Sequence, residues 1–313
     1  MTDAPQVVTV GAATVDRHYA VSNLPAPDGG AYAPEVTEHP GGVAANVARG
    51  VARLGQSAGI VTRLGEDPVG DTVAAGLREG ALDTTHVRRG PDTSTHCVVV
   101  RADDGTRSIV TAGDSVRNMR LRPTDRPYLA GADAVFVTAY APDCVQRTLA
   151  EWATADGFPP VVFDLSGPLA ELDGRGASEA SVDRWVETAD LFVTGRVAAE
   201  SYLDATGAAA AETLRGRGVA RAAVTSGPEG ATLVPGDGTD TVSLPAFDVS
   251  VVDETGAGDA FVAGLLHAWL LGDRSARAAG RFAAATAALS CTAAGASGDL
   301  PTADRVESFL AER

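Results

Sequence analysis

The chain has 313 residues, a hydrophobic fraction of 45% and a mean hydropathy of +0.03, which together indicate a globular protein and not a membrane protein. Its formal net charge is −16, and all 25 of its basic residues are Arg. A field this negative excludes nucleic acid and anionic membranes as partners, and the absence of Lys excludes a Walker A loop and Schiff-base catalysis.

Short β-branched, apolar runs alternate with longer Ala- and Arg-rich amphipathic stretches. The short runs predict strands at 7–10, 134–137, 161–165, 191–193, 222–225 and 231–234. Helical periodicity between them predicts helices at 45–55, 71–80, 143–153 and 208–218. This alternation is typical of an α/β fold with a mainly parallel sheet, where ligands bind beyond the carboxyl ends of the strands.

Two segments interrupt the alternation. Residues 13–40 are rich in turn formers, and residues 93–112 predict a hairpin around Asp103-Asp104-Gly105. A lone hairpin is marginally stable, so we expect both segments to pair into a small β-sheet, a lid over the ligand, within one domain spanning 1–313. An unpaired edge of that sheet favours association, which predicts a homodimer through the lid.

The stretch VVDETGAGDAFVAG combines a glycine-rich turn with the start of a helix. The preceding run, VSVV at 249–252, predicts a strand, and the helix that begins just before Asp259 ends at Gly272. Free N–H groups at a helix N-terminus bind anions, and Asp259 can act as a general base beside such an anion. Phe261 at the sixth position excludes a G-x-G-x-x-G fingerprint. Taken alone, Asp259 fits equally well a residue that complements the helix dipole.

Residues 253–259 resemble the second signature of the ribokinase-like PfkB family of carbohydrate kinases, D-T-T-G-A-G-D, with Glu254 as the departure. Residues 41–55 resemble the first signature, a Gly-Gly pair followed by Asn. The similarity continues through 62–71, 224–234 and 288–302 in the family's order. It implies a three-layer α/β/α sandwich with a mainly parallel sheet and a small β-sheet lid.

The resemblance also implies the activity, an ATP-dependent sugar kinase that phosphorylates a hydroxymethyl group of a furanose-type sugar. Two alternatives stay open within the family, a kinase of a sugar phosphate such as ribose 1-phosphate and a nucleoside kinase. Arg17, Arg101 and Arg107 are the cations that could hold an additional phosphate. A third alternative is a non-catalytic sugar-binding protein with the same fold.

Site residues follow from the matched motifs. By resemblance, Asp259 is the base, and the backbone of Gly256, Ala257 and Gly258 is the anion hole. The sugar contacts that the resemblance implies are Asp16, Gly41, Gly42 and Asn46. The ATP-binding loop that it implies contains Thr225, Gly227 and Gly230. The K⁺ site that it implies contains Asp253, Thr255 and Gly295.

Three of these assignments have alternatives or departures. Gly227 and Gly230 also fit a hairpin turn, and Asp253 also fits a turn cap. The family's Asn-x-x-Glu pattern, which organises Mg²⁺, is replaced by Gly195 and Ala198, with Glu200 two residues further on. Mg²⁺ is therefore expected with ATP, without its usual protein partners.

The acidic excess predicts adaptation to a concentrated-salt cytoplasm, because the Debye length falls to roughly 3 Å at 1 M salt. A GC-rich genome would explain the missing Lys, but not the excess of acids. The N-terminus lacks a basic, apolar signal sequence. Cys97, Cys144 and Cys291 match no metal-ligand spacing and fit reduced, packing cysteines. These features predict a cytoplasmic protein.

Overall fold

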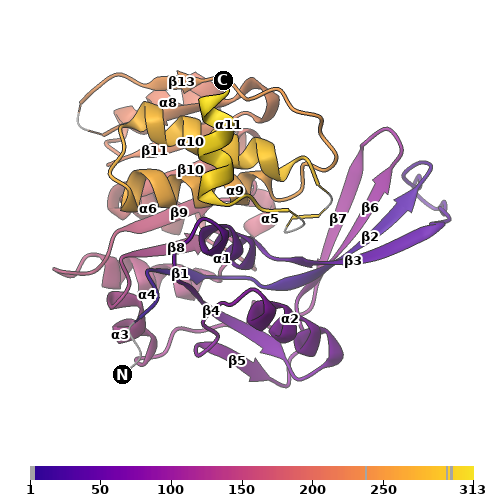
Figure 1. Cartoon of the computed structure of the whole chain (residues 1–313). Coiled ribbons are helices and arrows are strands. Elements are labelled where there is room, and N and C mark those ends of the chain that lie inside the picture. Colours follow the sequence, from indigo (N-terminus) through magenta and orange to yellow (C-terminus); the bar gives the residue numbers. More distant parts are fainter. Residues whose placement is uncertain (1–3, 237, 294, 297–298) are drawn as a thin grey trace.

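The computed structural model describes residues 4–236, 238–293, 295–296 and 299–313. A nine-stranded sheet forms the centre of this part of the chain (Figure 1). Its order is β13 (Val242–Leu244), β12 (Ala231–Val234), β11 (Ala222–Thr225), β10 (Leu191–Gly195), β9 (Val161–Leu165), β8 (Ala134–Thr138), β1 (Val7–Val10), β4 (Ala58–Gly65) and β5 (Val87–Gly90). The pairs β11–β12 and β12–β13 are antiparallel, and the remaining neighbours are parallel.

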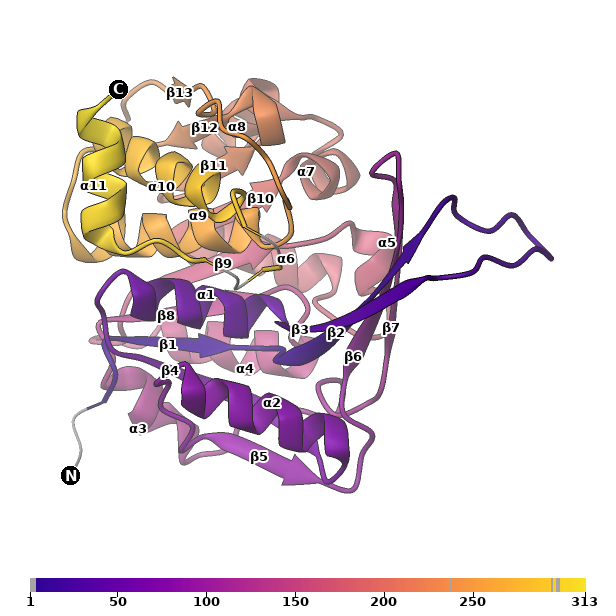
Figure 2. The ribbon, with the colours of Figure 1, turned by 45° about the vertical axis from the view of Figure 1, so that its right-hand side comes forward.

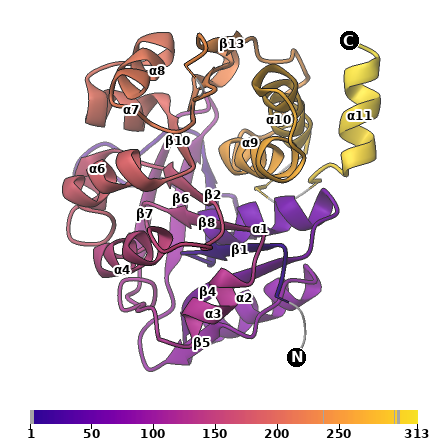
Figure 3. The same ribbon diagram turned by 90° about the vertical axis from the view of Figure 1, so that its left-hand side faces the viewer.

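Helices cover both faces of this sheet (Figure 3). One face carries α1 (Val43–Arg53), α2 (Pro68–Glu79), α9 (Ala257–Leu265), α10 (Ala276–Ser290) and α11 (Ala303–Ala311). The other carries α3 (Asp125–Ala130), α4 (Asp143–Ala153), α5 (Leu169–Leu172), α6 (Glu179–Thr188), α7 (Arg196–Leu203) and α8 (Gly207–Gly216). Each face has its own apolar core because the buried strands alternate their side chains between the two. The predicted three-layer sandwich is confirmed.

A second, four-stranded sheet projects from the carboxyl end of β1 (Figures 1 and 2). Its order is β3 (Glu35–Gly41), β2 (Thr14–Val21), β6 (His96–Ala102) and β7 (Arg107–Ala112). The predicted hairpin is confirmed as β6–β7, and it pairs through β6 with β2 from the earlier segment. We call these four strands the small sheet.

The predicted strands of the main sheet are all present, but the strand predicted at 249–252 is wrong. Val251 and Val252 are 55% and 53% exposed and belong to no sheet. The N–H of Val252 donates to the carbonyl of Cys291 at 2.8 Å, so this segment passes the end of α10 instead of pairing with a strand. Among the described helices, none combines the length and apolar character that crossing a membrane requires.

Candidate active site

The N-terminus of α9 carries the glycine-rich turn. Gly256 caps the helix with φ of 80°, and a Cβ built there would lie 2.8 Å from Cα of Ala296. Both observations require glycine at this position. The helix begins at Ala257, so Asp259 lies two residues after its start and not, as predicted, one.

The backbone amides of this turn are unequal. The N–H of Ala257 donates to the carbonyl of Glu254 at 3.2 Å, whereas the N–H groups of Gly258 and Asp259 make no hydrogen bond to any residue that the structure describes. A Cβ on Gly258 would meet no atom within 4 Å. The open, unsatisfied amides therefore lie at Gly258 and Asp259, and the predicted contribution of Ala257 is not supported.

Asp259 meets Asn46 across the interface of two helices. Asn46 Nδ2 donates to Asp259 Oδ2 at 2.8 Å. The approach is possible because α1 and α9 pack closely: a Cβ on Gly50 would lie 2.7 Å from Cβ of Ala263. Helix α1 also begins at a glycine, Gly42, with φ of 91°. Two glycine-capped N-termini thus converge on one site.

The electrostatic environment of Asp259 favours its protonated form. Burial raises the pKa of Asp259 to about 7, and the nearby carboxylates of Asp164 and Asp16 act in the same direction against the hydrogen bond from Asn46. Burial also raises the pKa of Asp164 to about 6, although Ser166 donates a hydrogen bond to it at 2.6 Å. A carboxyl group that titrates near neutral pH is suited to proton transfer.

Asp16 lies on β2 next to the start of α1. Thr14 Oγ1 donates to Asp16 Oδ1 at 2.9 Å, and a Cβ on Gly41 would lie 2.2 Å from Asp16 Oδ2. Burial raises the pKa of Asp16. Arg49, 8% exposed, stands behind the pair, donating to Asn46 Oδ1 at 3.4 Å and attracting Asp16. The structure therefore brings together Asp16, Gly41, Gly42, Asn46 and Asp259, as predicted.

Sequence reasoning missed Arg49 and Asp164. Both are charged residues inside otherwise apolar elements, the helix ANVARG and the strand VVFDL. A buried charge in such an element requires a partner or a function, so the presence of these charged residues in apolar elements could have identified them from the sequence.

The residues predicted for K⁺ also come together. Asp253 Oδ1 accepts hydrogen bonds from the N–H and hydroxyl of Thr255 at 3.0 and 2.7 Å, and its Oδ2 accepts one from the N–H of Gly295 at 3.0 Å. Arg101 Nη1, from the small sheet, lies 3.7 Å from Asp253 Oδ1. Arg17 instead pairs with Glu38 at 2.8 Å, on the opposite face of β2 from Asp16.

The predicted nucleotide loop follows β11. The N–H of Ser226 donates to the carbonyl of Gly230 at 2.8 Å, closing a turn from Thr225 through Gly227. Gly230 has φ of 98° and no room for a Cβ. Thr225 is paired in register with Gly195, so the loop and the altered Asn-x-x-Glu positions are neighbours.

Those altered positions offer no metal ligand. Gly195 has no side chain, Ala198 is 3% exposed in the core, and Glu200 is exposed on another side of α7. Across the described residues, no three His, Cys, Asp or Glu side chains cluster as a metal site would require. Protein-held Mg²⁺ is therefore not supported by these residues.

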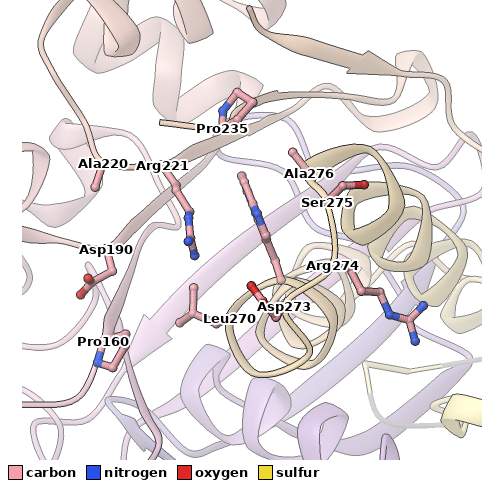
Figure 4. A pocket seen from close by; sticks show the side chains of 11 residues that line it. Pro160, Asp190, Ala220, Arg221, Pro235, Leu270, Asp273, Arg274, Ser275 and Ala276 are labelled. Atoms are coloured by element: carbon pink, nitrogen blue, oxygen red, sulfur yellow. The ribbon is translucent and has the colours of Figure 1, made fainter. Parts of the chain in front are cut away.

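Two larger hollows lie outside this group. One, of about 1090 Å³, opens beyond the carboxyl ends of β8 and β9 and contains Arg117, Arg120 and Arg175. The other, of about 640 Å³, lies at the opposite ends of the strands, between Arg221, Leu270 and Arg274 (Figure 4). None of the predicted site residues lines either hollow; the second also lies at the wrong end of the strands for a ligand site, so we do not assign the reaction to it.

Comparison with known proteins gives a consistent result. The model of the pfkB family carbohydrate kinases matches residues 4–303. The chain is 31% identical to an ATP-dependent ribose-1-phosphate kinase of Halopiger xanaduensis, over 98% of this chain and 99% of that protein. It is 29% identical to the aminoimidazole riboside kinase of Salmonella typhimurium, over 87% and 88%.

Solved structures share the fold. Ribokinase from Thermotoga maritima superposes with a TM-score of 0.82 at 23% identity, covering 98% of this chain and 99% of that one. Arabidopsis thaliana ribokinase complexed with ribose and ATP gives a TM-score of 0.82 at 24% identity, with the same coverage.

Proposed function

The chain belongs to the pfkB family of carbohydrate kinases, and we propose that it transfers the γ-phosphate of ATP to a hydroxymethyl group of a furanose-type sugar. It is thus a phosphotransferase with an alcohol acceptor. The observation that supports this reaction most directly is the meeting of Asp259, Asn46 and Asp16 beside open helix N-termini. These groups offer a base, an amide and a hydroxyl acceptor around one anion site.

Asp259 is the proposed base. Its pKa of about 7 leaves a substantial ionised fraction at neutral pH and enough basicity to take the proton of the attacking hydroxyl. Asn46 holds one of its oxygens in place. The open amides of Gly258 and Asp259, with the positive end of the α9 dipole, stabilise the charge that develops on the transferred phosphoryl group.

Asp16 is the proposed sugar anchor. An ionised carboxylate only accepts hydrogen bonds, which suits two neighbouring sugar hydroxyls. Gly41 allows the Asp16 carboxyl group to lie against the backbone, because a Cβ there would lie 2.2 Å from Oδ2, and Gly42 allows the start of α1 to approach Ala12, whose carbonyl oxygen would lie 2.5 Å from a Cβ. The side-chain amide of Asn46 donates to Asp259 and accepts from Arg49, which places it beside the proposed base, where it can also contact the substrate.

ATP is proposed to bind along the turn from Thr225 to Gly230, which follows β11 at the same edge of the sheet as the anion site. Mg²⁺ would enter with the nucleotide. Gly195 and Ala198 provide no ligand for it. K⁺ is predicted beside Asp253, where the Arg101 guanidinium also lies.

A sugar phosphate is the second candidate substrate, and one hollow favours it. Three arginines, Arg117, Arg120 and Arg175, line the 1090 Å³ hollow beside the small sheet. Arg175 lies 5.2 Å from the ring centre of Tyr140 and acts electrostatically on Cys97, which is paired in register with Asp16. The hollow also carries the carboxylates of Asp114, Asp143, Asp173 and Glu179, so an additional phosphate is favoured by the proximity of Arg175 to the sugar site and not by an excess of positive charge.

A substrate panel tests the function. ADP release would be measured in molar KCl with ribose, fructose, ribose 1-phosphate and a nucleoside. Transfer to a sugar supports the first proposal. Preference for the sugar phosphate, with a raised KM in Arg175→Gln but not in Arg215→Gln on the distant α8, supports the second. Tight sugar binding without ADP release would instead identify a sugar-binding protein.

A cytoplasmic, salt-adapted enzyme is the proposed setting. Thermal unfolding would compare dilute buffer with concentrated KCl, because unscreened carboxylates repel one another. We expect the midpoint to rise strongly with salt. An unchanged midpoint would contradict the salt adaptation and leave the kinase proposal intact.

The small sheet is proposed as a lid and as the contact of a homodimer. Its face away from Asp16 exposes Val36 and Val110 by 51% and 60%, next to Val98 and Val100, and a second copy of the same apolar face would cover it. Val110→Asp should give monomers in light scattering. Val197 is equally exposed, at 60%, but lies on α7, so Val197→Asp should leave the dimer intact.

Closure of the small sheet over the sugar is tested separately. It predicts that the protein becomes more compact in solution scattering when sugar binds, and unchanged scattering and hydrogen exchange would contradict it.

A further inference from the structure

Asp253 is a buried anion beside the proposed anion hole. It is 7% exposed and stands three residues before the glycine that caps α9. The amides of Gly295 and Thr255, the Thr255 hydroxyl and the Arg101 guanidinium all face its carboxylate. A buried carboxylate requires a compensating positive charge, and without one it would repel a phosphate bound at the neighbouring helix end.

The donors around Asp253 do not fit K⁺. An alkali cation is held by oxygen atoms, yet Thr255 and Gly295 present hydrogens to the carboxylate. Oδ1 accepts two such bonds, at 3.0 and 2.7 Å, and Oδ2 accepts one at 3.0 Å. These donors fill three of the roughly four acceptor positions of the carboxylate, so the groups that Thr255 and Gly295 direct at Asp253 satisfy it and do not themselves ligate a cation.

The positive charge next to Asp253 comes from the small sheet. Arg101 Nη1 lies 3.7 Å from Oδ1, and this is the one ion pair that Asp253 makes with the described residues. Arg101 lies on the same face of β6 as Cys97, because the two are four residues apart on one strand. That face carries the contact with Asp16, so Arg101 is directed toward the main body.

We infer that the guanidinium of Arg101 supplies at Asp253 the positive charge that the family resemblance assigns to K⁺, so that phosphoryl transfer by this chain does not require a monovalent cation. This inference rests on the proposed kinase function. A guanidinium stays charged at every physiological pH and carries the same unit charge as K⁺. Because Arg101 belongs to the small sheet and Asp253 to the main body, compensation at the anion hole is coupled to the position of the lid.

The contact is long and Arg101 is 45% exposed, so its effect is moderated by solvent. The test therefore compares matched variants under matched salt. Wild type, Arg101→Gln and Arg101→Lys would be assayed in KCl, NaCl and choline chloride at one molar concentration. Arg215→Gln is the control, because Arg215 lies on α8 and its ion pair is with Glu212 of the same helix.

We expect wild type, Arg101→Lys and the Arg215→Gln control to work at nearly the same rate in all three salts. Arg101→Gln should be about tenfold slower in choline chloride than in KCl, the effect of one lost charge interaction. A wild type that itself needs K⁺ would overturn the inference.

A second readout does not depend on turnover. Crystals soaked in RbCl should show anomalous density beside Asp253 in Arg101→Gln and none there in wild type. Rubidium beside Asp253 in wild type would overturn the inference. If no substrate is phosphorylated in any salt, the proposed function fails, while the rubidium result still decides the question of the cation.

Discussion

The helices of this protein begin in two different ways. At α2, α6, α10 and α11, a side chain accepts a hydrogen bond from the first turn; these caps are Asp67, Ser178, Ser275 and Thr302. Helices α1 and α9 instead begin at Gly42 and Gly256, with φ of 91° and 80° and no side-chain cap. Among the described helices, only these two have a glycine with positive φ as the N-cap residue, and these two meet at the proposed site.

The two kinds of helix start contribute to different properties, the side-chain caps to stability and the glycine caps to the proposed activity. A side-chain cap contributes about 0.5–2 kcal/mol by satisfying an amide that would otherwise lack a partner. A glycine start forgoes that contribution and leaves the amides available to an anion. The contrast predicts that substitutions at the two kinds of start affect different quantities, activity at one and stability at the other.

The largest effect is expected at the base. Asp259→Asn keeps the shape of the side chain but cannot accept a proton, so kcat should fall by about 10²–10⁴-fold, the usual contribution of a general base. ATP affinity should remain, because the amides of the turn are unchanged. Steady-state kinetics and nucleotide titration provide the measurement, and wild-type turnover would remove Asp259 from this role.

The next effect distinguishes two glycines of the same turn. Gly256→Ala must adopt a positive φ and meets Ala296 at 2.8 Å, so it should destabilise the fold by about 1–3 kcal/mol and reduce activity. Gly258→Ala meets no atom within 4 Å and should leave the thermal midpoint unchanged while reducing kcat, because the methyl group occupies the space for the anion. Equal thermal midpoints for the two variants would contradict this distinction.

A smaller effect is expected at a capped helix. Asp67 accepts hydrogen bonds from the N–H of Gly70 at 2.8 Å and from the N–H and hydroxyl of Ser94 at 2.8 and 2.6 Å. Asp67→Ala should therefore destabilise the protein by about 1–2 kcal/mol, with kcat unchanged. These bonds outweigh the effect of burial and lower the pKa of Asp67, so its contribution exists above the unfolded pKa and is lost as the pH falls. Urea unfolding of wild type and Asp67→Ala, at neutral and at low pH, measures both the loss of stability and its dependence on pH.

Local pattern was enough to predict much of this structure. Strands such as 161–165 and the hairpin β6–β7 follow from runs of β-branched residues and a turn, and the chain order of the motifs led to Asp16, Asn46 and Asp259. The strand at 249–252 was wrongly predicted because Val251 and Val252 have strand-like character but lie on the surface. Whether a segment is buried depends on its position in the tertiary structure, and the local sequence pattern does not specify that position.

The same limit applies to the site. Arg49 acts on Asp16 and Asp164 acts on Asp259, both far away in the chain, and the contact between Arg101 and Asp253 joins the small sheet to the main body. No spacing within one segment encodes such pairs. The use of the Ala257 amide by Glu254 depends on the helix starting at Ala257, and helix boundaries are weakly specified by sequence.

The smallest expected effect concerns how Asn46 tunes the base. Burial is the main reason that the pKa of Asp259 rises to about 7, and the hydrogen bond from Asn46 opposes the rise. The acid limb of kcat/KM should therefore lie near pH 7 in wild type. In Asn46→Ala it should move to higher pH by less than about one unit, since one neutral hydrogen bond contributes about 1 kcal/mol. A limb that stays in place or moves to lower pH would contradict the assignment of Asp259 as the titrating base.

Stability should show the same titration with the opposite consequence. The folded pKa of Asp259 lies above its unfolded value, so its contribution favours the folded state at low pH and is lost as the pH rises through about 7. Asp259→Asn removes this loss. Between about pH 5 and pH 8, its thermal midpoint should therefore fall less than that of wild type. At Asp67 the change of stability with pH has the opposite sign, because that carboxylate stabilises the fold only when it is ionised. The base beside the glycine start thus destabilises the fold in the ionised state that catalysis requires, whereas the capping carboxylate stabilises it in that same state.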